Sequence, residues 1–155
     1  MIPSDHFVRF YNEVFKFLEK RGEDDLRGYW LEISRHQEMH CLDLFRSKGL
    51  HGMKEYWDHI KDEENCDMTI REFADHVEIE MHKCPSLSKV LDNDAEPMTR
   101  YCDHCPGWCV PLIKKAGFYP VFDIISRTEP RCKFQVFRDE KDAERAEKEA
   151  LLLVK

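Results

Sequence analysis

The spacing of hydrophobic residues changes along this chain, and that change limits the folds that it can form. Over about residues 4–62, apolar residues recur every three or four positions, which is typical of amphipathic helices. Over 76–83 they alternate instead, with Val77, Ile79 and Met81 on one side, as in a half-buried strand. The sequence therefore predicts an α+β fold, in which N-terminal helices precede a small antiparallel sheet.

Three N-terminal helices are predicted, over about 4–20, 24–47 and 52–62. Gly22 ends the first helix and Gly49 follows the second. We expect the first helix to bury a stripe made of Phe7, Phe10, Tyr11, Val14, Phe17 and Leu18. We expect the stripe of the second helix to include Leu26, Trp30, His36, Gln37, His40, Cys41 and Phe45.

The C-terminal part alternates predicted helices with strands. A short helix follows Pro85, and residues 97–117 form two helices with a break at Pro106-Gly107. Strands over 119–127 and 131–138 flank a turn-like segment and predict a hairpin. A charged helix begins at Asp139 or Asp142. We expect one domain over 1–155, with a helical part (1–66) and a sheet-and-helix part (67–155) that holds most of the cysteines.

Length and charge exclude several classes of protein. A chain of 155 residues suits one domain, since domains usually contain about 100–200 residues. The net charge of −7 argues against a general nucleic-acid binder and against an anionic membrane surface as partner. No apolar run approaches the roughly 20 residues of a membrane span. The N-terminal residues lack the pattern of a secretory signal, so we expect a cytoplasmic protein.

Cysteine is the most unevenly distributed residue type. Five of the seven cysteines lie between Cys84 and Cys132. In a reducing compartment, such a cluster more often binds metal or performs chemistry than forms disulfides. The densest segment runs from Tyr101 to Cys109, and its Cys102-x2-Cys105 spacing allows two thiolates to reach one zinc ion.

A metal site needs further ligands. Cys84 ends one predicted strand and Cys132 lies in another, so both can approach the Cys102–Cys105 turn if their strands are neighbours. The predicted zinc ligands are thus Cys84, Cys102, Cys105 and Cys132, with Cys109 and His104 in reserve. An iron–sulfur cluster is less favoured, because the C-x2-C-x3-C spacing differs from the usual ferredoxin run. The alternative is a set of buried, reduced thiols that pack as small hydrophobic groups.

Three histidines are candidate general acids or bases, because histidine titrates near neutral pH. His36 and His40 lie four residues apart on the second helix, and a pocket against that helix would contain both. Glu38 stands in the wrong place for an H-E-x-x-H zinc motif. His82 precedes Cys84 by two positions on the same side of its strand. The alternative is that the helical pair consists of hydrogen-bonded core residues and that the outer face of the strand is solvated.

A family resemblance rests on three elements in order: Cys84-Pro85, Tyr101-Cys102 and Cys132-Lys-Phe. In these elements the chain resembles the L-2-amino-thiazoline-4-carboxylic acid hydrolase-like family, over about residues 68–138. That family is similar in layout to the 4-vinyl reductase-type small-molecule-binding domain. The resemblance implies ring-opening of a small cyclic amidine or amide, with Cys84, Cys102 and Cys132 as the matching positions. Cys105 departs from the family, which often has an acidic residue there.

Two hypotheses for the function follow. The first is a hydrolase of this type, with a metal-bound water or a cysteine thiolate as nucleophile. The second is a non-catalytic module that binds a small molecule or senses a metal, with a structural cysteine-rich metal site. Both predict a small-molecule ligand. The broad apolar arc of the first helix and the tail over 151–154 also allow a homodimer.

Overall fold

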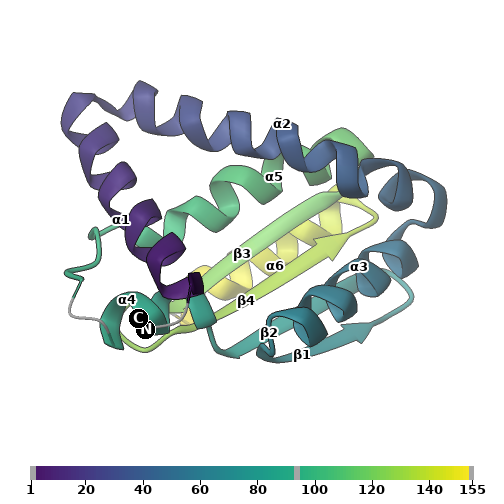
Figure 1. The fold of residues 1–155 in the computed structure, drawn as a ribbon. Coiled ribbons are helices and arrows are strands. Elements are labelled where there is room, and N and C mark those ends of the chain that lie inside the picture. Colours follow the sequence, from purple (N-terminus) through teal and green to yellow (C-terminus); the bar gives the residue numbers. More distant parts are fainter. Residues whose placement is uncertain (1–2, 93–94, 154–155) are drawn as a thin grey trace.

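A computed structural model describes residues 3–92 and 95–153, and the side chains of 6–92 and 95–150. Helices surround a four-stranded antiparallel sheet, which confirms the predicted α+β class (Figure 1). The elements are α1 (Pro3–Arg21), α2 (Glu23–Lys48), α3 (Leu50–Glu63), β1 (Asp67–Glu72), β2 (His76–Lys83), α4 (Pro85–Asp92), the 3-10 helix η1 (Tyr101–Asp103), α5 (His104–Ala116), β3 (Tyr119–Ser126), β4 (Arg131–Phe137) and α6 (Glu140–Leu153).

The strand order of the sheet is β1-β2-β4-β3, so the last strand lies between the second and the third. After β2 the chain passes through α4, η1 and α5 before it returns as β3, and β4 then fills the gap. In the register of β2 and β4, Ile79 lies opposite Phe134 and Met81 lies opposite Cys132. The two cysteine-bearing segments that follow β2 and begin β4 are therefore neighbours.

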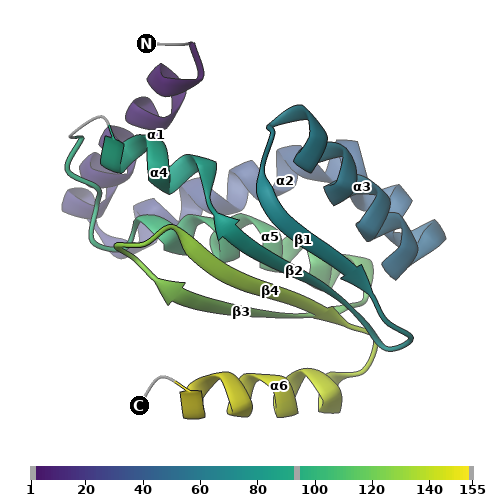
Figure 2. The same ribbon diagram turned by 90° about the horizontal axis from the view of Figure 1, so that it is seen from below.

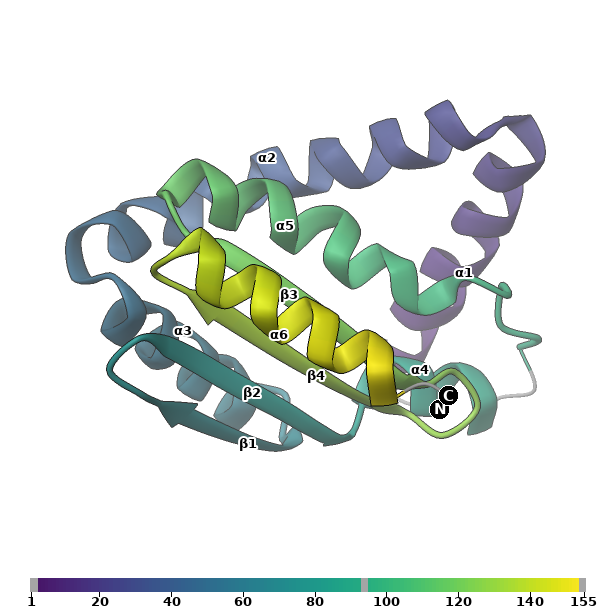
Figure 3. The ribbon, with the colours of Figure 1, turned by 180° about the vertical axis from the view of Figure 1, so that it is seen from behind.

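The two faces of the sheet are covered differently (Figures 2 and 3). Helices α2, α3 and α5 lie over one face, and α6 lies over the other face along β3 and β4. The main core cluster fills the first side, with Phe45, Met53, Val77, Ile113 and Val136 among its fully buried members. This layering explains the alternation in β2, because Val77, Ile79 and Met81 all face the helices.

A second core cluster joins α1 and α4 to the beginnings of α2 and α5. Its fully buried members include Phe15 on α1, and Tyr101 and Trp30 are nearly as enclosed. The Phe15 ring lies 5.8 Å from the Trp30 ring and 5.9 Å from the Tyr101 ring, between centroids. This aromatic packing holds the segment that contains the densest cysteine run against α1 and α2.

The structure corrects part of the predicted core face of α1, although Tyr11 and Leu18 of that face do pack against the second core cluster. Phe7, Phe10 and Phe17 are between 60% and 63% exposed, whereas Phe15 and Asn12 are completely buried. The helix has apolar residues on most of its sides, so hydrophobic spacing alone does not select the inward face. The homodimer stays a prediction, and the tail over 151–154 lies outside the residues whose side chains are described.

Two further differences concern the predicted elements. β1 forms where the sequence analysis assigned no strand. The predicted break at Pro106-Gly107 is wrong, because α5 runs unbroken from His104 to Ala116. Pro106 occupies the first turn of that helix, where a backbone N–H has no helical partner to lose. None of the described helices is both long and apolar enough to cross a membrane.

Candidate functional site

Four cysteines from different parts of the chain line one small cavity of about 30 Å³. Cys84 follows β2, Cys102 lies in η1, Cys105 is in the first turn of α5, and Cys132 is in β4. The structure thus brings the four predicted cysteines to one cavity. Because Met81 pairs with Cys132, the end of β2 lies beside the beginning of β4.

A backbone hydrogen bond continues this pairing beyond the strands. The N–H of Cys84 donates to the carbonyl oxygen of Pro130 at 2.7 Å. Pro130 belongs to the turn between β3 and β4, and it lines the small cavity as well. The hairpin turn and the segment after β2 therefore form one side of the cavity, and η1 with α5 contributes another.

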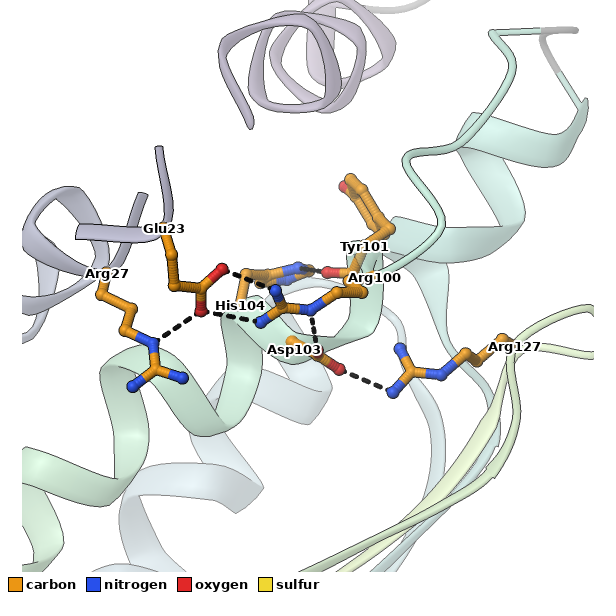
Figure 4. Close-up of polar contacts among 7 residues, drawn as sticks. All are labelled: Glu23, Arg27, Arg100, Tyr101, Asp103, His104 and Arg127. Atoms are coloured by element: carbon orange, nitrogen blue, oxygen red, sulfur yellow. Dashed lines mark hydrogen bonds and ion pairs between the residues drawn. The ribbon is translucent and has the colours of Figure 1, made fainter. Parts of the chain in front are cut away.

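An ion-pair network holds the Cys102–Cys105 turn in place (Figure 4). Asp103 accepts hydrogen bonds from Arg100 at 2.9 Å and from Arg127, in the β3–β4 turn, at 2.7 Å. Arg100 also pairs with Glu23 at the beginning of α2, at 2.7 Å, and Glu23 pairs with Arg27 at 2.6 Å. The hydrogen bond from Arg100 lowers the pKa of Glu23 to about 2. The network thus joins η1 to both α2 and the hairpin turn.

Within the turn, His104 contacts the thiol of Cys105. The Nδ1–H of His104 donates to the carbonyl oxygen of Tyr101 (Figure 4), and its Nε2 lies 3.3 Å from Sγ of Cys105. Burial lowers the pKa of His104 to about 4, so the ring is neutral near pH 7. Since Nδ1 carries the proton, Nε2 is left as the acceptor for the thiol S–H.

Burial raises the pKa of all four thiols that line the small cavity. The pKa of Cys132 rises to about 12, that of Cys105 rises well above its usual value, and those of Cys84 and Cys102 rise as well. A thiol with a raised pKa is protonated near neutral pH, and the thiolate is the stronger nucleophile. These cysteines are therefore neutral, weakly polar groups in the resting protein.

The described side chains include no group of three or more histidine, cysteine, aspartate or glutamate residues that could hold a metal ion. The four cysteines thus border one cavity without forming a ligand set in this conformation. The zinc site at Cys84, Cys102, Cys105 and Cys132, and the iron–sulfur cluster, stay predictions.

A larger cavity of about 260 Å³ lies between the sheet and helices α2, α3 and α5, and we call it the chamber. Aromatic rings form much of its wall, including those of Trp57, Trp108 and Phe134. No Asp, Glu, Lys, Arg or His is found among the described residues that line it. Cys105 and Cys132 line both the chamber and the small cavity, so the two spaces meet at these thiols.

The three histidines proposed as acids or bases lie outside both cavities. His36 and His40 are exposed on α2, because the inward side of that helix carries Gln37 and Cys41 instead. His82 lies on the face of β2 opposite Met81, where its Nε2 is 2.8 Å from Oγ1 of Thr69. The structure therefore corrects these three assignments: none of the three side chains reaches the thiols or the chamber.

The two reserve metal ligands, Cys109 and His104, lie in different cavities. Cys109 is one turn further along α5 than Cys105 and lines the chamber, and burial raises its pKa to about 12. His104 lines the small cavity. Gln37 and Tyr56 also line the chamber, and no sequence motif marks either of them as a chamber residue. The helical spacing of Phe45, Tyr56 and Trp57 indicates a buried face, but it does not distinguish a packed core from a cavity.

Comparisons with protein-family models, with curated proteins and with solved structures find no match for this chain. The resemblance to the thiazoline-carboxylate hydrolase-like family therefore stays a prediction.

Proposed function

We propose that this protein binds an uncharged, largely apolar small molecule in the chamber. The observation that carries the proposal is a cavity of about 260 Å³ whose described lining contains no charged side chain. Binding sites for small molecules are usually mostly apolar, with a few polar groups that orient the ligand. Gln37, Tyr56 and the chamber thiols can serve as those groups here.

The size and polarity of the chamber narrow the class of ligand. An apolar cavity of roughly 150 Å³ holds benzene, so the chamber has room for a ring with substituents. Burying a carboxylate or an ammonium group without a partner is very unfavourable. A zwitterionic thiazoline carboxylate, which the family resemblance implies, would have no counter-charge among the lining residues. We therefore favour a binding module over the hydrolase, with an uncharged aromatic or alicyclic ligand.

Titration with a matched pair of ligands tests the proposal. Indole is uncharged, and indole-3-acetate adds a carboxylate to the same ring. We expect indole to raise the melting temperature in a concentration-dependent way and to bind with a negative heat-capacity change. Indole-3-acetate should do neither. Equal binding of the two ligands, or no binding of indole, would contradict the proposal.

A variant in which a larger side chain fills the chamber tests whether indole binds there. Ile60 on α3 lines the chamber, whereas Ile125 on β3 is exposed and does not line it. Ile60→Trp should abolish the effect of indole, and Ile125→Trp should leave it unchanged. If Ile60→Trp folds and still binds indole with the original affinity, the ligand occupies another place.

Zinc binding at the four-cysteine cavity is a second proposal, favoured by the convergence of Cys84, Cys102, Cys105 and Cys132. Binding would displace the thiol protons and would require the side chains to move inward. Metal analysis of protein purified without added metal tests it. Near one zinc per chain supports it, a brown protein with bound iron supports an iron–sulfur cluster, and a metal-free protein contradicts both.

The proposed location is the cytoplasm. All seven cysteines are free. A reducing compartment keeps such thiols unpaired. Subcellular fractionation of the native host, with the protein detected through a label at its C-terminus, would test this location. Recovery in the membrane or secreted fraction would contradict it.

A further inference from the structure

We propose that two copies of this chain associate through the outer side of α1, with the two helices antiparallel. We call this surface the α1 stripe, and it consists of Phe7, Phe10, Val14, Phe17 and Arg21. No described residue of α1 lines the chamber, so the association does not depend on a ligand there.

The first observation is the exposure of three large rings on one helix. Phe7, Phe10 and Phe17 are all more than half exposed, and Val14 between them is half-buried. Single apolar side chains are ordinary on a protein surface, but a contiguous group of them marks an interaction site. Helix α1 lies at the edge of the molecule, where a second body can approach it (Figure 1).

The second observation is that the α1 stripe has the spacing of a coiled-coil seam. Positions 7, 10, 14, 17 and 21 follow the alternating steps of three and four residues of a heptad pattern. The buried side of α1 carries Val8, Asn12 and Phe15, which lie on roughly the opposite side of the helix. Helix α1 therefore has one side for its own core and a second apolar side for a partner helix.

The third observation is that the charges beside the α1 stripe suit a second copy. In one antiparallel register, Val14 packs against Phe17 of the second copy. The same register places Glu13 beside Lys20 of the second copy, and symmetry repeats the pair. Glu13 already pairs with Lys16 of its own helix at 2.9 Å, yet its side chain stays exposed, as does Lys20. Opposite charges at such flanking positions determine partner and orientation in coiled coils.

The position of Arg21 supports the same register. Its Cζ atom lies 5.9 Å from the centroid of the Phe17 ring, so the guanidinium extends over the α1 stripe. In the antiparallel dimer, Arg21 reaches the Phe10 ring of the second copy, where a cation–π contact is favourable. A parallel dimer would instead place the two Arg21 side chains opposite each other, with like charges in contact.

Other arrangements on the same surface are less favourable. An antiparallel register shifted by one heptad pairs Phe7 with Phe17 of the second copy, but it brings the two Glu13 carboxylates together. An anionic membrane is a poor alternative partner, because Glu13 borders the α1 stripe and the chain has a net charge of −7. The charges therefore favour a second copy over a membrane surface.

The area of the α1 stripe sets the expected strength of the dimer. A phenylalanine side chain can bury roughly 200 Å², so the exposed parts of the three rings contribute about 350 Å² per copy. Twice that area is below the roughly 1,200 Å² at the lower end of standard interfaces. We therefore expect a weak, reversible dimer, and the monomer predominates in the dilute solutions used for unfolding experiments.

Sedimentation velocity of the full, reduced chain over about 1 to 300 µM tests the association. The average mass should rise from 18.6 kDa towards twice that value. Phe10→Gln/Phe17→Gln should stay monomeric throughout. Leu31→Gln/Met39→Gln, at exposed positions on α2, should associate as the original chain does. A monomer at the highest concentration, or loss of the dimer in the α2 variant alone, would overturn the proposal.

Charge reversal tests the register between the copies. Glu13→Lys and Lys20→Glu should each weaken self-association by about ten-fold, because like charges then meet at both flanks. An equal mixture of the two variants pairs opposite charges at both flanks again, so it should associate with nearly the original affinity. If both variants are folded by circular dichroism and the mixture stays as weak as each alone, the antiparallel register is wrong.

Vesicles of phosphatidylcholine and phosphatidylserine test the membrane alternative. The original chain should stay in the supernatant when the vesicles are sedimented. Cosedimentation of a chain that is monomeric without vesicles, and its loss in Phe10→Gln/Phe17→Gln, would assign the α1 stripe to a membrane surface and overturn the proposal.

Discussion

The side-chain oxygen of Asn12, on α1, accepts a hydrogen bond from the backbone N–H of Met98 at 2.9 Å. The nitrogen of the same amide donates to the carbonyl oxygens of Ala95 and Glu96, at 2.8 and 3.2 Å. Asn12 is completely buried, so this one side chain satisfies three backbone groups. It ties α1 to the segment that leads into η1 and the cysteines.

Replacement of this amide should be costly. Asn12→Ala leaves the buried N–H of Met98 without this acceptor and removes the donor to two carbonyl oxygens, and we expect it to lower the free energy of unfolding by about 3 kcal/mol. Glu13→Ala, at the adjacent exposed position, should change it by less than about 0.5 kcal/mol. Urea denaturation followed by circular dichroism measures both. Similar stability of the two variants would show that Asn12 does not anchor the segment.

The orientation of α1 yields a matched pair of phenylalanine variants. Phe15 is completely buried among aromatic rings, whereas Phe17 is 60% exposed. Phe15→Ala should lower the free energy of unfolding by about 3–5 kcal/mol, and Phe17→Ala by less than about 1 kcal/mol. Denaturant unfolding of the two variants, compared at equal m-values, provides the measurement. A reversed order would mean that α1 presents its other face to the core.

Two glycines in helices should respond oppositely to alanine. A Cβ at Gly107 on α5 would lie 2.7 Å from the ring of Trp30, so Gly107→Ala should destabilise the protein by about 1–3 kcal/mol. Gly28 on α2 is exposed, with nothing near its Cβ position, so Gly28→Ala should stabilise by about 0.5–1 kcal/mol. Melting temperatures by calorimetry distinguish the two. Equal shifts would contradict the close contact between α5 and α2.

The Glu23 ion pairs predict a loss of stability in acid. The folded-state pKa of Glu23 is lowered from 4.5 to about 2 by its hydrogen bonds with Arg100 and Arg27. A carboxylate with a lowered pKa stabilises the folded state above its unfolded pKa, and this contribution disappears as the pH falls from 4.5 towards 2. Glu23→Gln should therefore flatten the pH dependence of unfolding in that window.

Glu19→Gln, at an exposed position on α1, is the control for this measurement. Glu19→Gln should leave the pH dependence of the free energy of unfolding unchanged. If Glu23→Gln and Glu19→Gln give the same pH profile, the network around η1 does not contribute through Glu23.

The sequence predicted the fold class, and it predicted that Cys84 and Cys132 could meet if their strands were neighbours. Alternation over 76–83 identifies a strand, and pairing of β2 with β4 brings Cys84 and Cys132 together. Other features depend on tertiary contacts. The inward face of α1 is selected by the hydrogen bonds of Asn12 and the rings around Phe15, and neither is visible in hydrophobic spacing.

The histidine assignments show a different limit. A rotation of one position around a helix moves a side chain by about 100°, so the stripe of α2 could include either His36 or Gln37. The structure turns Gln37 towards the chamber and His36 towards solvent. The chamber itself could not be predicted, because apolar residues that surround a cavity have the same spacing as those that fill a core.

Nuclear Overhauser effects between indole and labelled methyl groups show directly whether an uncharged ligand occupies the chamber. Met81 and Leu112 line the chamber, whereas Met39 is 84% exposed on α2. We expect intermolecular effects from indole to the methyl groups of Met81 and Leu112 and none to Met39. Contacts with Met39 alone, or no contacts to the chamber methyl groups at saturating indole, would contradict it.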